Sequence, residues 1–401
     1  MSRRLSSFHP FPARMAPELA LEAISRVDED GLVLDPMAGS GTVLRQASQL
    51  GRRAMGLDLD PLAVLMSTVA TTKVDDEALA SFADETTRKA RVLASGDYRP
   101  SWITDDLETT TFVDYWFGPA QQRDLAGIAL ALEAACTSEQ AIFIKPLADV
   151  LRLALSRIIV TKDSGASLAR DVSHSRPHRV KIDSSYDVFS SFESSVRRLR
   201  VSLQASTLKG EVAVSTGDAR QVSSLCKEPI DAIVTSPPYL NAIDYIRGHR
   251  LALVWLGYTV GELRAIRAKS VGAERGVARR LLTHEQVRVL DAIVGQHSLP
   301  NREYSLIGRF AMDISDLMRE FKKVLRPEGF AVLVVGNSLI RGELVNNTAG
   351  FVQAGLEAGF TLLRLVEREL PDSSRYLPVR GDSQGKLARR MRTESVITLS
   401  A

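Results

Sequence analysis

Residues 231–239 have the sequence DAIVTSPPY, in which an apolar run leads directly into Ser236, Pro237, Pro238 and Tyr239. Two consecutive prolines remove two backbone donors and stiffen the chain. What remains is a rigid group of acceptors, the Ser236 hydroxyl and the proline carbonyls, beside an aromatic ring. This arrangement suits a planar ligand that donates N–H hydrogen bonds while the Tyr239 ring stacks on its face.

A second segment, residues 35–42, has the sequence DPMAGSGT. Its two glycines, Gly39 and Gly41, allow a tight turn and a close approach of the backbone to a ligand. The helix predicted to follow presents free N–H groups at its start. The segment lacks the Gly-Lys-Ser/Thr of a phosphate loop and the third glycine of a dinucleotide-binding turn. We therefore expect a small ligand without a pyrophosphate.

Two aspartates follow the next predicted strands. Asp58 comes 17 residues after Gly41, and Asp218 follows the run Val212–Val214. A carboxylate at the first position can accept hydrogen bonds from a ribose diol, and one at the second from an adenine amino group. Each aspartate alone is more often a helix cap, and the glycine pair alone is more often an ordinary turn. Their occurrence at successive strand ends favours a ligand site.

The elements that would position these residues form an α/β pattern. Short apolar runs bounded by Gly, Asp and Pro predict buried parallel strands, and helices are predicted at 41–50 and from Pro61. This alternation is typical of a doubly wound sheet. Two later runs predict an antiparallel pair at a sheet edge, which gives about seven strands. The predicted strands are 32–34, 53–57, 212–214, 230–234, 330–335, 360–366 and 395–399.

Between the second and third strands the pattern is mainly helical, which predicts a large helical insertion. We predict a division into a cofactor half (1–73), a helical insertion considered for target recognition (74–210) and a catalytic half (211–401). The other expected elements are helices at 121–135, 150–159, 192–203 and 313–325, a polar loop at 161–181 and a turn at 326–329.

Composition excludes several classes of protein. The 401 residues are 45% hydrophobic and 25% charged, which are ordinary globular values. No apolar run approaches the roughly 20 residues that span a bilayer, and the N-terminus does not resemble a secretory signal. Two cysteines exclude a disulfide scaffold or a multi-cysteine metal site, and no spacing of His, Asp or Glu predicts a metal. We expect a cytoplasmic protein with no membrane partner.

Charge is distributed unevenly along the chain, although the net charge is only +3. Residues 61–150 hold 7 basic and 14 acidic side chains, whereas residues 151–210 hold 11 and 5, and residues 247–282 hold 8 and 2. Clustered positive charge favours a polyanion surface, with an ordinary solvated face as the alternative. The candidate nucleic-acid contacts are Arg170, Arg176, His178, Arg179, Arg247, Arg250, Arg264, Arg267 and Lys269.

The pair DPMAGSGT and TSPPY resembles the amino-group DNA methyltransferases that use S-adenosylmethionine. FHPFPARM at 8–15 is similar to that family's N-terminal cofactor element, and LRPEGFAVLVVGNS at 325–338 to its fifth-strand region. The resemblance covers about 8–72 and 212–338, roughly half of the chain. It implies a Rossmann-like methyltransferase sheet. The helical insertion departs from the family, because it does not resemble a known recognition domain.

The resemblance also implies residue roles. The methyl group would pass to an exocyclic amine of a flipped base, with Ser236 and the Pro237 carbonyl as acceptors, Pro238 stiffening the loop, and Tyr239 as the stacking platform. The serine form of this motif recurs in cytosine-N4 enzymes, so we expect cytosine N4, otherwise adenine N6. The expected cofactor contacts are Phe8, His9, Pro10, Asp35, Pro36, Ala38, Gly39, Ser40, Gly41, Thr42, Asp58 and Asp218.

Two alternatives stay open. Some guanine-N2 tRNA methyltransferases resemble the same layout, but they carry an N-terminal RNA-binding domain, and here the cofactor-like element begins near Phe8. We therefore expect DNA as the partner. A non-catalytic nucleic-acid binder with a decayed methyltransferase fold is disfavoured, since both reactive segments are intact. The sequence leaves open a restriction or phage-defence partner protein.

Overall fold

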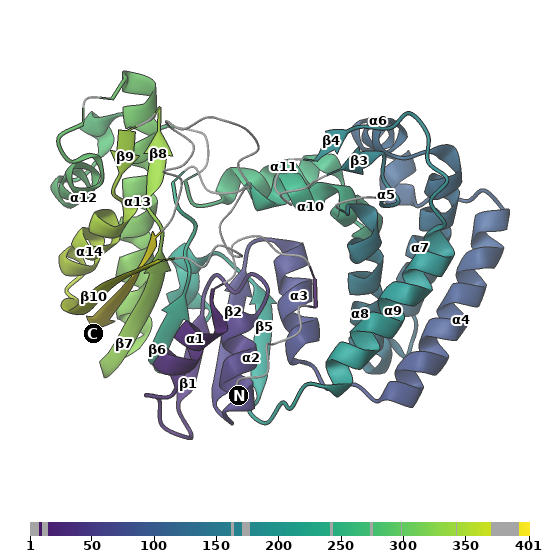
Figure 1. Ribbon diagram of the computed structural model, residues 1–401, viewed down its shortest axis with the longest axis horizontal. Coiled ribbons are helices and arrows are strands. Elements are labelled where there is room, and N and C mark those ends of the chain that lie inside the picture. Colours follow the sequence, from purple (N-terminus) through teal and green to yellow (C-terminus); the bar gives the residue numbers. More distant parts are fainter. Residues whose placement is uncertain are drawn as a thin grey trace. The chain divides into compact units, whose positions relative to one another are not determined.

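The computed structural model describes residues 8–9, 15–161, 164–170, 177–240, 244–272, 276–297, 299–341, 343–369 and 393–401. The chain divides into two compact units (Figure 1). The helical unit holds Phe8 and His9 together with Asp60–Leu208 and Asp244–Arg267. The sheet unit holds the described parts of Ala13–Leu59, Lys209–Ile243 and Ala268–Ala401. None of the helices in these stretches is long and apolar enough to span a bilayer.

The sheet unit is built on seven strands in the order β10-β11-β7-β6-β1-β2-β5 (Figure 1). The five strands from β7 to β5 run parallel, and β11 is antiparallel to both β7 and β10. The predicted α/β class, with about seven strands and a mainly helical insertion, is confirmed. The strands are β1 (Leu32–Asp35), β2 (Arg53–Asp58), β5 (Val212–Thr216), β6 (Ile230–Thr235), β7 (Leu325–Val335), β10 (Thr361–Glu369) and β11 (Thr393–Ser400).

Alternate residues of the central strands enter two separate cores. Leu34 and Ile233 face the core formed with α12, α13 and α14, whereas Val33 and Ala232 face the core formed with α1 and α2. Side chains alternate in this way because a strand has a period of two residues, and burial of both faces requires continuous apolar runs. The remaining elements of this unit are α1 (Pro17–Ile24), α2 (Thr42–Gln49), η1 (Ala219–Ser224), η3 (Arg279–Leu281), α12 (His284–Val294), α13 (Asn301–Val324), β8 (Ser338–Ile340), β9 (Glu343–Val345) and α14 (Asn347–Glu357).

The helical unit has an apolar core of its own. Five of its helices begin at an aspartate whose side chain accepts a backbone N–H: Asp60, Asp75, Asp106, Asp187 and Asp244. Such caps stabilise a helix start and account for some of the acidic side chains in this part of the chain. The elements are α3 (Pro61–Thr71), α4 (Asp76–Ser95), α5 (Ser101–Thr104), α6 (Leu107–Trp116), α7 (Pro119–Cys136), α8 (Ala141–Ile159), β3 (Ala169–Arg170), β4 (His178–Arg179), α9 (Val188–Gln204), α10 (Tyr245–Leu253), η2 (Val254–Leu256) and α11 (Val260–Lys269).

Some predicted elements differ from the structure. The loop expected at 161–181 contains an antiparallel ribbon, β3 with β4, and buries Ala166 and Leu168 beneath its polar residues. The turn expected at 326–329 lies inside β7, where the register with β6 shifts between Ile230 and Ala232. Pro and Gly therefore mark an irregularity within a strand there and not its start. The predicted division at residues 73 and 210 stays a prediction.

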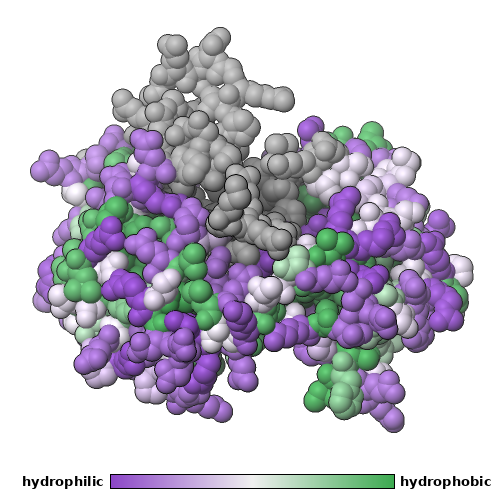
Figure 2. All heavy atoms as spheres, turned by 60° about the horizontal axis from the view of Figure 1, so that its bottom comes forward, coloured by the Kyte–Doolittle hydropathy of each residue, from purple (hydrophilic) through white to green (hydrophobic). Residues whose placement is uncertain are grey.

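Hydrophilic side chains cover most of the face drawn in Figure 2, and hydrophobic ones occur in smaller groups. Such a surface is ordinary for a globular domain.

Candidate active site

The glycine turn follows β1 and is fixed to β2. Gly39 and Gly41 have φ values of +51° and +75°, in the left-handed region that favours glycine. The Ala38 N–H donates to the Leu57 carbonyl at 2.8 Å, and the Gly39 N–H donates to Asp58 Oδ2 at 2.9 Å. The turn and the Asp58 carboxylate therefore form one rigid group.

The remaining predicted residues of this segment lie in the same group. Pro36 is buried, and Met37 N–H donates to Asp35 Oδ1 at 3.2 Å. The hydroxyls of Ser40 and Thr42 lie 3.4 Å apart at the start of α2. The structure thus brings together all the residues that were predicted for the cofactor between 35 and 42.

The loop that begins at Ser236 leaves the sheet beside this turn. β6 pairs with β1 in parallel, so the carboxyl ends of the two strands lie at one edge of the sheet. Thr235, the last residue of β6, donates its hydroxyl to Asp35 Oδ1 at 2.7 Å. A buried hydrogen bond therefore joins the two segments that the sequence predicted to act together.

The Ser236 hydroxyl has a defined orientation. It lies 3.0 Å from the Val334 carbonyl oxygen on β7, and because a carbonyl can only accept, the hydroxyl must donate its proton there. The lone pairs of the Ser236 oxygen then remain to accept from another donor. Tyr239 OH lies 3.4 Å away. Within this loop Pro237 is buried, while Pro238 is half-buried.

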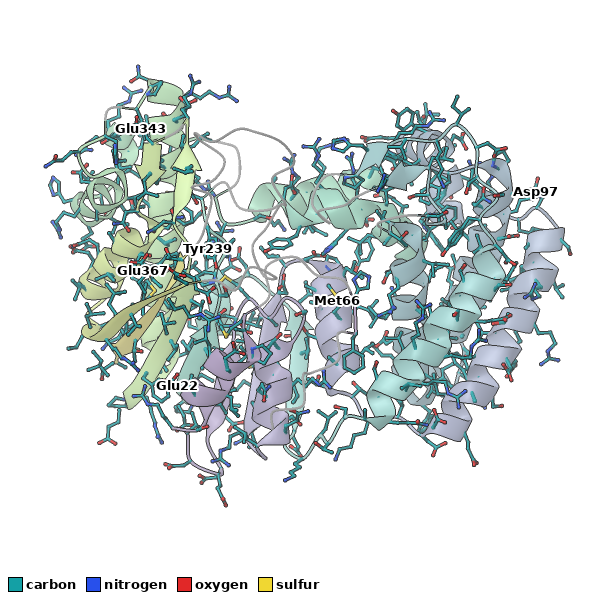
Figure 3. All side chains as sticks on the ribbon, in the orientation of Figure 1. Glu22, Met66, Asp97, Tyr239, Glu343 and Glu367 are labelled. Carbon is teal, nitrogen blue, oxygen red and sulfur yellow. The ribbon has the colours of Figure 1, made fainter. Side chains whose placement is uncertain are left out.

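Tyr239 lies beyond the end of β6 and packs against the core of the sheet unit (Figure 3). Burial raises the pKa of its phenol to about 12, so the side chain is neutral at physiological pH. It can therefore offer a ring face and a hydroxyl without carrying charge.

Asp35 lies beneath both loops and is 3% exposed. Burial raises its pKa to about 7, against the opposing effect of the hydrogen bonds from Thr235 and Met37, and the negative charge of Asp58 raises it further. Two carboxyl groups thus interact at this edge of the sheet. A site of this kind favours a ligand that carries positive charge.

Asp218 follows β5 and is held by Arg220. Its Oδ1 accepts from the Arg220 backbone N–H at 2.9 Å and from Nε at 3.0 Å, and its Oδ2 accepts from the guanidinium at 2.7 Å. Arg220 also pairs with buried Asp313 at 2.6 Å. Asp218 is therefore a helix cap in an ion-pair network, the alternative considered above, and its contact with an adenine stays a prediction. Nothing in the sequence near Arg220 indicated this network.

Phe8 and His9 belong to the helical unit, whereas the glycine turn belongs to the sheet unit. Phe8 is buried in the helical core, and its carbonyl accepts from the Arg157 guanidinium. His9 is also buried. Their cofactor role stays a prediction. Pro10 and Arg176 lie outside the described residues.

The basic candidates lie mainly in the helical unit. Arg170 and His178 face each other in the β3–β4 ribbon and are exposed, as are Arg247 and Lys269. Arg267 pairs with Asp244 at 2.6 Å. The other three contact α6: Arg179 lies over Tyr115, Arg250 over Phe112, and Arg264 pairs with Glu108.

One buried pair of ionisable side chains in the helical unit was not predicted. Asp60 caps α3 through Leu62 N–H and lies 2.5 Å from Nδ1 of His249 on α10. The partners are far apart in the sequence, so only the fold shows the pair. Among the described residues, no group of three His, Cys, Asp or Glu side chains is arranged to hold a metal ion.

No protein-family model matches the chain. It is similar to the type II methyltransferase M.MvaI from Kocuria varians, with 21% identity over 83% of this chain and 77% of that relative. Alignment to rRNA methyltransferase aviRa from Streptomyces viridochromogenes gives 13% identity and a TM-score of 0.30, over 97% of this chain and 87% of the other. For a SAM-dependent methyltransferase from Methanosarcina mazei the values are 9% and 0.31, over 97% and 98%. The sequence similarity to M.MvaI extends along most of both chains and supports a methyltransferase as the class of protein.

Proposed function

We propose that this chain is an S-adenosylmethionine-dependent DNA methyltransferase that methylates an exocyclic amino group of a flipped base, cytosine N4 ahead of adenine N6. The observation that carries the proposal is the Thr235–Asp35 hydrogen bond, because it joins the glycine turn to the Ser236 loop at one edge of the sheet. The similarity to a type II methyltransferase over most of the chain supports the same reaction.

The residues of the turn fit this cofactor. S-adenosylmethionine supplies an electrophilic methyl group on a positively charged sulfur. The interacting carboxyl groups of Asp35 and Asp58 favour a cation, and the Gly39–Gly41 turn permits a close approach of the backbone. Asp58 and the turn would hold the nucleoside part, as the resemblance implies.

Ser236 and Pro237 would act on the amine of the base. An aromatic amine is a poor nucleophile because its lone pair is delocalised into the ring. An acceptor on its N–H groups stabilises the positive charge that develops on nitrogen, and preorganised groups of this kind have large effects on rate. The oriented Ser236 hydroxyl is suited to accept, and Tyr239 is suited to stack on the base.

DNA is the substrate that the resemblance implies, and a base inside a duplex must leave the stack to reach such a loop. The serine at position 236 favours cytosine N4 over adenine N6, as in the enzymes that the motif resembles.

The proposal is tested by digesting DNA from cells that express the chain and measuring modified nucleosides by mass spectrometry. We expect N4-methylcytosine, at a much lower level in cells that express Ser236→Ala. If N6-methyladenine is found instead, the target base is adenine and the proposed methyl-transfer reaction stands. Purified protein is then assayed with labelled cofactor on DNA and on tRNA. Transfer to tRNA alone, or to neither nucleic acid, would overturn the proposal.

A further inference from the structure

One face of helix α6 gathers arginines from two distant parts of the sequence. Residues 108, 112 and 115 are spaced as i, i+4 and i+7, so their side chains lie along one side of the helix. An arginine contacts each of them. The contacts are an ion pair of Arg264 with Glu108, the guanidinium carbon of Arg250 at 5.0 Å from the Phe112 ring centre, and that of Arg179 at 4.6 Å from the Tyr115 ring centre.

The ribbon that carries Arg179 is joined to α6 by a backbone hydrogen bond of Leu168, in addition to the contact of Arg179 with the Tyr115 ring. Arg179 lies in β4, which pairs with β3, and the Leu168 N–H just before β3 donates to the Trp116 carbonyl at 2.8 Å (Figure 1). The Trp116 ring in turn contacts Tyr115 edge-on, with ring centres 5.1 Å apart. Tyr115 is 50% exposed, and Arg179 is exposed. The guanidinium is therefore both oriented and accessible.

Beside this contact lies an arginine cluster, defined as Arg247, Arg250 and Arg267. Burial lowers the pKa of Arg250; the charge of Arg247 lowers it further, Asp244 raises it, and Arg267 again lowers it. Among the described residues, Arg250 Nε has no hydrogen-bond partner and Arg247 makes no ion pair, whereas Arg267 pairs with Asp244 at 2.6 Å. Cations placed this close repel one another, and a polyanion relieves that repulsion.

We propose that this side of the helical unit binds duplex DNA, with the arginine cluster on phosphates and Arg179, seated on the Tyr115 ring, on the edge of a base. The proposal rests on the proposed function and assigns part of its sequence recognition to the β3–β4 ribbon and α6.

The position of the Arg179 guanidinium over the Tyr115 ring argues for a base contact by this arginine. A phosphate contact needs only positive charge near the backbone and carries no sequence information. A base contact needs the planar fork of the guanidinium in a fixed orientation, and stacking on an aromatic ring supplies that orientation. An arginine fork pairs best with O6 and N7 of guanine in the major groove. Guanine is therefore the expected base.

The test uses the full chain and three variants. Arg179→Lys keeps the charge and removes the planar guanidinium, and Tyr115→Leu removes the aromatic ring beneath it. Arg88→Lys is the control, because it makes the same exchange at an exposed site on α4. Methylated positions are mapped by sequencing DNA from expressing cells. We expect Arg179→Lys and Tyr115→Leu to lower the preference for guanine at one position of the methylated sequence by about 5- to 150-fold. The sequence preference of Arg88→Lys should equal that of wild type. Every variant should bind S-adenosylmethionine as wild type does.

Unchanged sequence preference in both Arg179→Lys and Tyr115→Leu would overturn the assignment. Wild-type protein that methylates no DNA would instead count against the proposed function, and fluorescence anisotropy with a labelled DNA duplex then tests the surface alone. Equal duplex binding by wild type and by Arg247→Ala would refute the surface, and so would binding to an RNA hairpin but not to DNA. Weaker duplex binding by Arg247→Ala would support it.

Discussion

At the scale of single residues, the Ser236 hydroxyl cannot donate a hydrogen bond to a substrate. Because its proton is donated to the Val334 carbonyl, it meets an incoming amine as an acceptor. Ser236→Ala removes that acceptor and leaves the proline backbone in place. We expect the single-turnover rate of methyl transfer to fall by about 100-fold, as for the loss of one preorganised group, with cofactor affinity retained.

Ser224→Ala is the matched control, since that exposed hydroxyl donates to the nearby Gln221 carbonyl. Single-turnover assays and calorimetric titration of both variants separate the rate from cofactor binding. Equal rates for Ser236→Ala and Ser224→Ala would remove Ser236 from the chemistry.

The buried carboxyl of Asp35 predicts an unusual pH dependence of stability. Burial raises its pKa from 3.8 to about 7 in the folded state, so between these values the folded chain binds more protons than the unfolded chain. Stability that is present at low pH is therefore lost as the pH rises through this window. Asp35→Asn does not titrate and keeps an oxygen for the Thr235 hydroxyl. We expect the free energy of unfolding of the variant, relative to wild type, to rise by about 2–3 kcal/mol from pH 5 to pH 8.

Urea unfolding at both pH values measures this difference, in which the titration of all other groups cancels. A pH-independent difference would mean that Asp35 is charged throughout or is not buried in solution.

The sequence predicted those site residues that can be recognised from their immediate neighbours in the chain. Gly39, Gly41 and Asp58 follow strands and have few alternative structural uses in that combination, and the structure joins them. Thr235 and Arg220 were not predicted, because a threonine at a strand end or an arginine after an aspartate is common. Their importance comes from partners up to 200 residues away.

At the scale of elements, helix α2 offers a comparison between its two ends. Gly41 precedes the helix with φ +75°, and Gly51 follows it with φ +80° and open space around it. An alanine in this left-handed conformation costs about 1–2 kcal/mol at either position. We expect Gly41→Ala and Gly51→Ala to lower the free energy of unfolding similarly, but only Gly41→Ala to weaken S-adenosylmethionine binding.

Urea unfolding and calorimetric titration of the two variants provide the check. Equal loss of cofactor affinity in both would show that general destabilisation, and not the turn, controls binding.

The seven strands of the sheet were predictable because they contain short apolar runs, and the longer helices because their apolar residues recur with a helical period. The β3–β4 ribbon was not, because two-residue strands carry no period and their polar residues resemble a loop. The segment 326–329 was misassigned because Pro and Gly commonly end an element, whereas here the partner strand β6 accommodates them through a register shift.

At the scale of the whole molecule, charge placement matters more than its total. A net charge of +3 gives little overall attraction to a polyanion. Local clusters of positive charge must therefore supply the attraction, and the sequence predicted the two basic segments. Their convergence on α6 was not predicted, because only tertiary packing brings Arg179 and Arg250 to the same helix.

The dependence of DNA binding on salt tests this local origin. Arg267 already pairs with Asp244. If the other two arginines of the cluster each neutralise one phosphate, the slope of log affinity against log salt is about −1.8, so going from 50 to 200 mM salt weakens binding about 12-fold. Arg247→Ala should make the slope shallower by about 0.9, because one fewer counterion is released. Arg88→Ala, which removes an exposed charge from α4, should leave it unchanged. Fluorescence anisotropy with a labelled duplex at several salt concentrations gives each slope. Equal slopes for wild type and Arg247→Ala, or an equal change in Arg88→Ala, would place the phosphate contacts elsewhere on the molecule.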